Sequence, residues 1–145
     1  MYHSVLPLLG WTTTLAVALL AWLRGGLPER YGALLFVGAG LAVFVSHALL
    51  PTSAEGLLLL AIDALMAIGF LALAIRYSSL WIGAAMLLQA GQFSLHAWYL
   101  VSELERDRFY AITNNLVTVG ILVCILVGTL ISWRRRVKAA AAQAA

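Results

Sequence analysis

The sequence predicts an all-α integral membrane protein, folded as a five-helix up-and-down bundle. Its 145 residues are 63% hydrophobic and only 10% charged, and its mean hydropathy is +0.98. Soluble domains carry about 25% charged residues, so this chain has too little charge to cover a surface in water. The composition excludes a soluble enzyme and a disordered chain, and the single cysteine excludes a disulfide scaffold.

Five long apolar runs separate the few charged segments, at about residues 4–23, 31–50, 56–75, 79–101 and 109–133. Each run holds about 20 residues or more, enough at ~1.5 Å per residue to cross a hydrocarbon core of ~30 Å. Backbone groups inside lipid must form hydrogen bonds within their own segment, so each run is predicted to be a helix. The segments between the runs are short, which makes consecutive helices antiparallel neighbours in one transmembrane domain, residues 1–145.

Taken in order, each run has a feature that supports its assignment. The first run has no basic segment before it and is too long for the apolar core of a signal peptide, so it is predicted to be retained. The second run ends just before Pro51, and the third contains Asp63, the only charged residue inside a run. The fourth run carries two glutamines and a histidine. The fifth ends at a basic cluster, which begins a short cytoplasmic tail at residues 134–145.

The basic residues predict the orientation in the membrane. With the C-terminus in the cytoplasm, seven of the nine Arg and Lys residues lie inside, whereas Arg106 and Arg108 lie outside beside three acidic residues. The positive-inside rule therefore places the N-terminus outside, and we expect a multi-pass protein of the cell inner membrane. Anchoring to anionic headgroups accounts for the basic cluster, so no nucleic-acid partner is expected.

Small residues recur at every fourth position in two of the runs. The stripes are Gly38, Ala42 and Ser46 in the second run and Gly120, Cys124 and Gly128 in the fifth. Membrane helices associate through such faces because backbones can approach closely there. The stripes therefore predict helix contacts, either within the bundle or with a larger membrane complex or a second copy of the chain.

Polar side chains gather in the outer half of the predicted bundle, and the cytoplasmic half holds nothing comparable. Asp63 lies about 10 Å below the outer end of its run, where an ionised carboxylate costs at least ~2.5 kcal/mol unless it is paired or protonated. Residues 89, 92 and 96 follow steps of three and four and so share one helix face. The predicted pocket, for a ligand or a partner, consists of His47, Asp63, Gln89, Gln92, His96 and Asn114.

The first functional hypothesis is structural. The chain would be a small accessory or anchor subunit of a larger membrane complex, and its polar pocket would set the helix register or hold a partner. Interhelical hydrogen bonds worth about 0.6–2 kcal/mol each suffice for that role. This hypothesis requires neither a catalytic residue nor a cofactor.

Two alternatives involve a bound molecule. His47 and His96 lie at similar depth on parallel helices, as a bis-histidine haem b requires, and a polar pocket beside them can hold a quinone. In these two histidines and in its helix count the chain resembles the small membrane anchors of respiratory complexes. In the second alternative, Asp63 binds or transports a small ligand or ion together with the histidines.

Enzymatic activity and a metal centre are not expected. Ser46 and His47 do not form a catalytic dyad, because neighbouring residues on a helix point about 100° apart. The two histidines and Asp63 come from three different runs and show no spacing typical of metal ligands.

Overall fold

The computed structural model describes residues 5–49 and 52–144, and within these ranges every regular element is an α-helix. The five helices are α1 (Val5–Arg24), α2 (Leu27–Leu49), α3 (Thr52–Tyr77), α4 (Leu80–Val101) and α5 (Arg108–Ala144). The predicted all-α class is therefore confirmed, with one helix for each apolar run. The predicted run ends at residues 4 and 50 lie outside the described residues.

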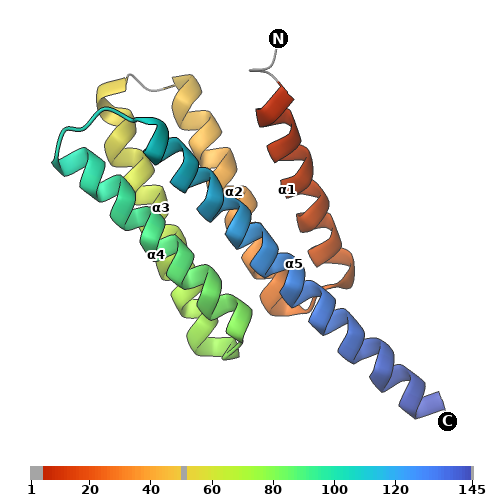
Figure 1. Cartoon of the computed structure of the whole chain (residues 1–145). Helices are drawn as coiled ribbons and strands as arrows, with labels where there is room; N and C mark the ends of the chain where they lie inside the picture. Colours follow the sequence, from red (N-terminus) through yellow and green to blue (C-terminus); the bar gives the residue numbers. More distant parts are fainter. Residues whose placement is uncertain (1–4, 50–51, 145) are drawn as a thin grey trace.

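Each helix runs antiparallel to the one before it, so the chain goes up and down through a single bundle (Figure 1). Consecutive helices pack against each other, and α5 also contacts α1 and α2. α5 therefore lies between the α1–α2 pair and the α3–α4 pair, and its C-terminal end projects beyond the other helices (Figure 1). The predicted tail at residues 134–145 continues this helix as far as Ala144.

Three helices in the described part of the chain are both long and apolar enough to cross a membrane. These are Leu27–Leu49, Gly56–Tyr77 and Arg108–Ala144. Large apolar side chains are exposed on all five helices, whereas Asp63 and Gln89 are buried. This distribution is the reverse of that in a soluble bundle and indicates a membrane protein.

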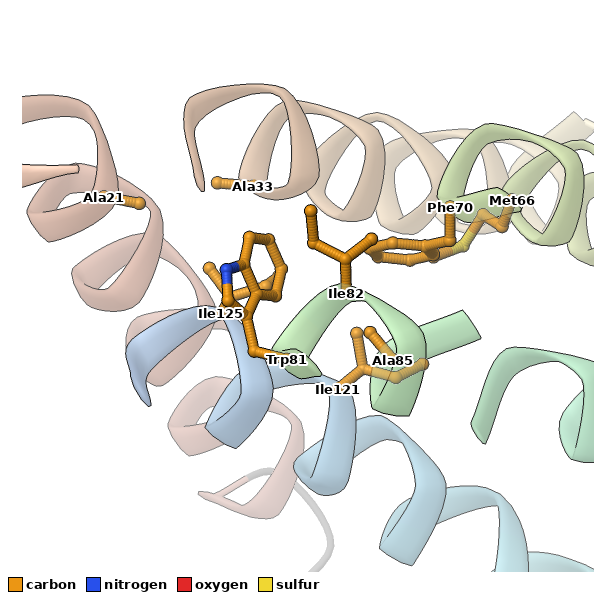
Figure 2. Close-up of a cluster of buried hydrophobic side chains, with 9 residues drawn as sticks. All are labelled: Ala21, Ala33, Met66, Phe70, Trp81, Ile82, Ala85, Ile121 and Ile125. Atoms are coloured by element: carbon orange, nitrogen blue, oxygen red, sulfur yellow. The ribbon is translucent and has the colours of Figure 1, made fainter. Parts of the chain in front are cut away.

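The core gathers where α3, α4 and α5 cross. Phe70, Ile82, Ile121 and Ile125 have almost no exposed surface, and they meet side chains of α1 and α2 (Figure 2). Trp81 lies in the same cluster and is only 7% exposed.

Trp81 has room because two other helices present glycines to it. A Cβ atom added at Gly128 of α5 would lie 2.5 Å from the indole Nε1, and one at Gly32 of α2 would lie 3.0 Å from Cη2. The indole of Trp81 therefore packs between α2 and α5, at the end of the bundle where α4 begins.

The two small-residue stripes have different environments. In α5, Gly120 lies against Leu88 of α4 and Gly128 lies against Trp81, while Cys124 between them is half-buried. In α2, Ser46 is buried and donates to the carbonyl oxygen of Val43 at 2.7 Å. The other two members of that stripe, Gly38 and Ala42, are exposed and line a groove between α2 and α3.

Two helix ends use left-handed residues, and these set the directions of the next helices. Ser78 has φ 45°, and its N–H donates to the carbonyl oxygen of Ala74, which closes α3. Glu103 has φ 49°, and the N–H of Leu104 reaches back to the carbonyl oxygen of Tyr99, which ends α4 in a Schellman motif. The first turn sends α4 back along α3, and the second sends α5 back along α4.

Candidate functional site

Five of the six residues predicted to form the pocket meet in one hydrogen-bonded cluster between α3, α4 and α5. Gln89 Nε2 donates to Asp63 Oδ1 at 3.1 Å, and Gln92 Nε2 donates to Asn114 Oδ1 at 3.0 Å. His96 joins the two halves, because its Nδ1 contacts Asp63 Oδ2 and its Nε2 lies 3.1 Å from Asn114 Oδ1. We call Asp63, Gln89, Gln92, His96 and Asn114 the polar cluster.

Local geometry explains why these side chains converge. The steps of three and four residues place Gln89, Gln92 and His96 on one face of α4. The tight turn at Ser78 folds α4 back along α3, and α3 and α4 pack closely. Asp63 is therefore brought opposite that face of α4.

The bonding pattern assigns one proton to the contact between His96 and Asp63. Asn114 Oδ1 is an acceptor only, so the His96 Nε2 that bonds to it must carry a hydrogen. The other ring nitrogen, Nδ1, faces a carboxylate oxygen of Asp63, and a hydrogen bond between them needs one further proton. Wherever that proton resides, the pair has no net charge.

Charge neutrality explains how a carboxyl group is accommodated inside this bundle. The side chains of Asp63 and His96 are only 8% and 11% exposed. A buried ion whose partner is missing is strongly destabilising, whereas a paired and hydrogen-bonded one is tolerated. Gln89, which is 1% exposed, bonds the second carboxyl oxygen, so both oxygens of Asp63 have partners.

A cavity of about 350 Å³ lies beside the polar cluster, at the end of the bundle where α4 meets α5. His96 of α4 contributes to its wall, together with other residues of α3 and α4, of the loop between α4 and α5, and of α5. The lining residues are Gly56, Leu59, His96, Tyr99, Leu100, Glu103, Leu104, Arg106 and Tyr110. We call this cavity the outer pocket.

Aromatic rings form one side of the outer pocket. The ring of Tyr110 stacks on His96 with centroids 5.3 Å apart, and the ring of Tyr99 lies 4.9 Å from that of Tyr110. The guanidinium of Arg106 lies 5.6 Å from the Tyr110 ring centroid. The lining of the pocket therefore combines an aromatic wall, a cation and an imidazole ring whose nitrogens are already engaged.

Asp107 holds this wall in place from the start of α5. Its Oδ1 accepts the backbone N–H of Tyr110 at 2.8 Å, as an N-cap residue does, and the hydroxyl of Tyr99 at 2.7 Å. These two donors, the Tyr110 amide first, hold the pKa of the Asp107 carboxyl below its ordinary value.

His47 is the predicted pocket residue that is not part of the polar cluster. It lies on α2 with an exposed side chain. A bis-histidine haem needs one free ring nitrogen from each histidine, but both nitrogens of His96 already face Asp63 and Asn114. As arranged, His47 and His96 do not fit a haem. Among the residues that the structure describes, no group of three His, Cys, Asp or Glu side chains is placed to hold a metal ion.

The expectation that the other half of the bundle holds no comparable polar residue is wrong, because Glu29 is buried at the start of α2, at the opposite end from the outer pocket. Its Oε2 accepts the N–H of Gly26 at 2.7 Å, and its Oε1 accepts the hydroxyl of Ser132 at 2.9 Å. Glu29 was expected in a connecting segment, but α2 begins at Leu27, which makes Glu29 the N3 residue, and its carboxylate caps the N–H of the N-cap residue Gly26. Because glycine has no side chain to accept the N3 amide, only this half of a capping box forms, and the usual Ser/Thr signal for it is missing from the sequence.

Sequence reasoning also missed Tyr99, Arg106 and Tyr110 as pocket residues. Tyr99 and Tyr110 lie near the facing ends of α4 and α5, and Arg106 lies in the loop between these helices, so no helical spacing links the three residues to the polar cluster. Comparison with protein-family models, with curated proteins and with solved structures finds no match to this chain. Its function is therefore argued from the site itself.

Proposed function

We propose that this chain is a membrane protein that binds a small ligand with a polar, hydrogen-bonding head in the outer pocket. The observation that carries the proposal is the buried His96–Asp63 pair, of which His96 lines a cavity. A volume of about 350 Å³ falls within the range of roughly 300–1,000 Å³ that is usual for small-molecule sites.

The proposal includes five spans of the cell inner membrane, with the N-terminus outside and the C-terminus in the cytoplasm. Four basic helix ends support this orientation, since Arg24, Arg30, Arg76 and the cluster at 134–138 belong to the same end of the bundle (Figure 1). The polar cluster and the outer pocket then open to the outside. α4 is included as a span because its polar residues face the bundle interior and not lipid.

The polar cluster favours binding over passage through the membrane. Inward from Gln89, the space between α3, α4 and α5 is filled by the apolar core around Phe70, Ile82 and Ile121. A transported ion or solute would need polar groups along that path. We therefore propose a binding site and not a transport route.

The test is to identify small molecules that stay with the protein through purification in mild detergent. Gly56→Leu fills the outer pocket, and its Cβ would meet only the Cδ1 atom of Leu100, at 3.1 Å. Gly91→Leu is the matched control, because Gly91 is exposed on α4 with no atom within 4 Å of an added Cβ. Denaturing mass spectrometry is expected to release one molecule per wild-type or Gly91→Leu chain and none from Gly56→Leu.

An optical spectrum of the same samples detects a chromophoric ligand such as a quinone. If the wild-type protein releases nothing that Gly56→Leu lacks, the ligand-binding proposal fails.

A second candidate function is that of an accessory or anchor subunit of a larger membrane complex. Its support is that polar contacts tie the helices into one rigid unit: the polar cluster joins α3, α4 and α5, and Glu29 joins α2 to α5. A rigid bundle with little polar surface suits an anchor. A stoichiometric partner that co-purifies with both wild-type and Gly56→Leu chains supports this function, and purification as a lone chain contradicts it.

A further inference from the structure

A long apolar groove runs between α2 and α3 on the opposite side of α3 from the polar cluster. Its volume is about 780 Å³, and its lining includes small residues of the two helices. Gly38 and Ala42 come from α2, and Gly69 and Ala72 come from α3. Tyr31 and Arg76 lie at one end of it, where α2 begins and α3 ends.

We infer that this groove binds one anionic phospholipid, with its acyl chains along the small residues and its phosphate at Arg76. The inference goes beyond the ligand proposed for the outer pocket and depends only on the membrane embedding proposed above. Charge, length and the position of aromatic residues support it independently.

The charge argument starts from the arginine at the end of the groove. Arg76 is exposed and its guanidinium lies 5.7 Å from the ring of Tyr77. The acidic residue closest to this end in sequence and fold is Glu29, whose carboxylate is engaged by Gly26 and Ser132. The ion pair found among the described residues joins His96 to Asp63 and does not involve Arg76. The Arg76 guanidinium is therefore available to bind a phosphate.

The length argument favours a lipid over a partner helix. The α2 lining extends from Leu27 to Ala42, and the α3 lining extends from Ile62 to Tyr77. At 1.5 Å per residue each is about 22 Å long, which is close to half of a bilayer of ~40–45 Å including headgroups. A partner transmembrane helix that packs at a small crossing angle would contact a face through most of the ~30 Å hydrocarbon core. The groove thus matches one leaflet.

The aromatic residues mark the headgroup level. Tyr31 and Tyr77 line the groove at the same end as Arg76. Tyrosine rings favour the boundary between headgroups and hydrocarbon, and arginine side chains extend from that level toward phosphates. The Arg76 end of the groove therefore coincides with the headgroups of one leaflet, and the small residues lie at acyl-chain depth.

Substitutions that fill the groove can be compared with matched substitutions elsewhere on the surface. An added Cβ at Gly38 meets no atom within 4 Å, so Gly38→Leu fills the groove without a clash. Ala42→Leu is a second, independent way to fill it. Gly91→Leu adds the same apolar volume to an exposed face of α4 outside the groove, and Arg134→Gln removes a charge from the same end of the bundle outside the groove.

The experiment is native mass spectrometry of the full chain released from nanodiscs of phosphatidylglycerol and phosphatidylcholine in equal amounts with identical acyl chains. Wild-type protein, Gly91→Leu and Arg134→Gln are expected to retain one phosphatidylglycerol, preferred about fivefold over phosphatidylcholine, as one arginine predicts. Arg76→Gln is expected to bind both lipids equally. Gly38→Leu and Ala42→Leu are expected to lose roughly nine-tenths of either lipid.

Equal retention of the two lipids by the wild-type protein overturns the inference, as does unchanged retention by both groove-filling variants. A dimer that disappears in Gly38→Leu, with no retained lipid, also overturns it and identifies a second copy as the occupant. Failure of the protein to enter nanodiscs would instead refute the membrane embedding itself. The outer pocket is tested separately by Gly56→Leu, which is expected to retain lipid like the wild-type protein.

Discussion

At the residue scale, the interior of the bundle depends on one neutral pair, formed by Asp63 and His96. Asp63 is the residue that an apolar helix tolerates least, and His96 is the partner that shares one proton with it and makes the pair neutral. Gln89 and Asn114 then satisfy the remaining polar atoms of the pair. Each member depends on the others, so removal of one leaves a buried group without its partner.

A double-mutant cycle tests this dependence. Asp63→Leu and His96→Leu are each expected to destabilise the protein by about 1–3 kcal/mol, because each leaves the other group unpaired. The double variant is expected to cost at least about 1 kcal/mol less than the sum of the two. The measurement is unfolding of purified protein in mixed micelles, with Asn115→Ala, at an exposed neighbour of Asn114, as the control. Strict additivity would contradict the pairing.

Asp107 gives a second prediction, for the wall of the outer pocket. Its pKa is lowered in the folded protein by the Tyr110 amide and the Tyr99 hydroxyl, so the bonds it accepts stabilise the loop above its ordinary pKa of about 3.9. That contribution is lost as the pH falls through the lowered pKa. The NMR shift of the Tyr110 amide is expected to titrate with a midpoint below about 3.9, and this transition should be absent in Asp107→Asn. A midpoint above that value would show that the two bonds do not form.

At the element scale, the helices were predictable from the sequence but their ends and rotations were less so. Each apolar run became one helix, since a run of about 20 apolar residues without helix-breaking charges favours a continuous helix. α2 begins earlier than predicted because Glu29 caps it, although charge alone indicated a loop. The burial of Trp81 in the first turn of α4 was not predicted, because the glycines that make room for it lie on α2 and α5, distant in sequence.

The glycines of the bundle give a prediction with a matched control. Gly128→Ala is expected to destabilise the protein by about 1–3 kcal/mol, because the added methyl group would overlap the Trp81 indole. Gly83→Ala is expected to be neutral or stabilising by up to about 1 kcal/mol, since nothing lies within 4 Å of its added Cβ and alanine favours the helix. Thermal unfolding in the same detergent compares the two. Equal effects would contradict the close approach of α4 and α5.

The candidate site was also predictable in part. The face of α4 that carries Gln89, Gln92 and His96 follows from helical periodicity, and a short turn places α3 opposite it. The place of His47 was not predictable, because the rotation of α2 about its axis depends on packing that no local pattern encodes. The outer pocket depends on the left-handed residue Glu103, which directs the loop over His96.

At the scale of the whole molecule, the two ends of the bundle carry different kinds of polar side chain. The polar cluster and the outer pocket lie toward the α4–α5 loop, while most basic residues and the Arg76 end of the groove lie at the other end. α5 connects the ends, and at the basic end the Arg136 guanidinium donates to the carbonyl oxygen of Arg24. The orientation of the chain in the membrane therefore decides which side of the membrane the outer pocket faces.

Cysteine labelling in intact cells tests that claim most directly. In a Cys124→Ala background, Leu104→Cys places a thiol at the rim of the outer pocket, and Ser78→Cys places one at an exposed position at the opposite end. A membrane-impermeant maleimide is expected to label Leu104→Cys in intact cells and Ser78→Cys only after the membrane is permeabilised. Labelling of Ser78→Cys alone in intact cells, or of both variants equally, would contradict a membrane-spanning bundle whose pocket opens to the outside.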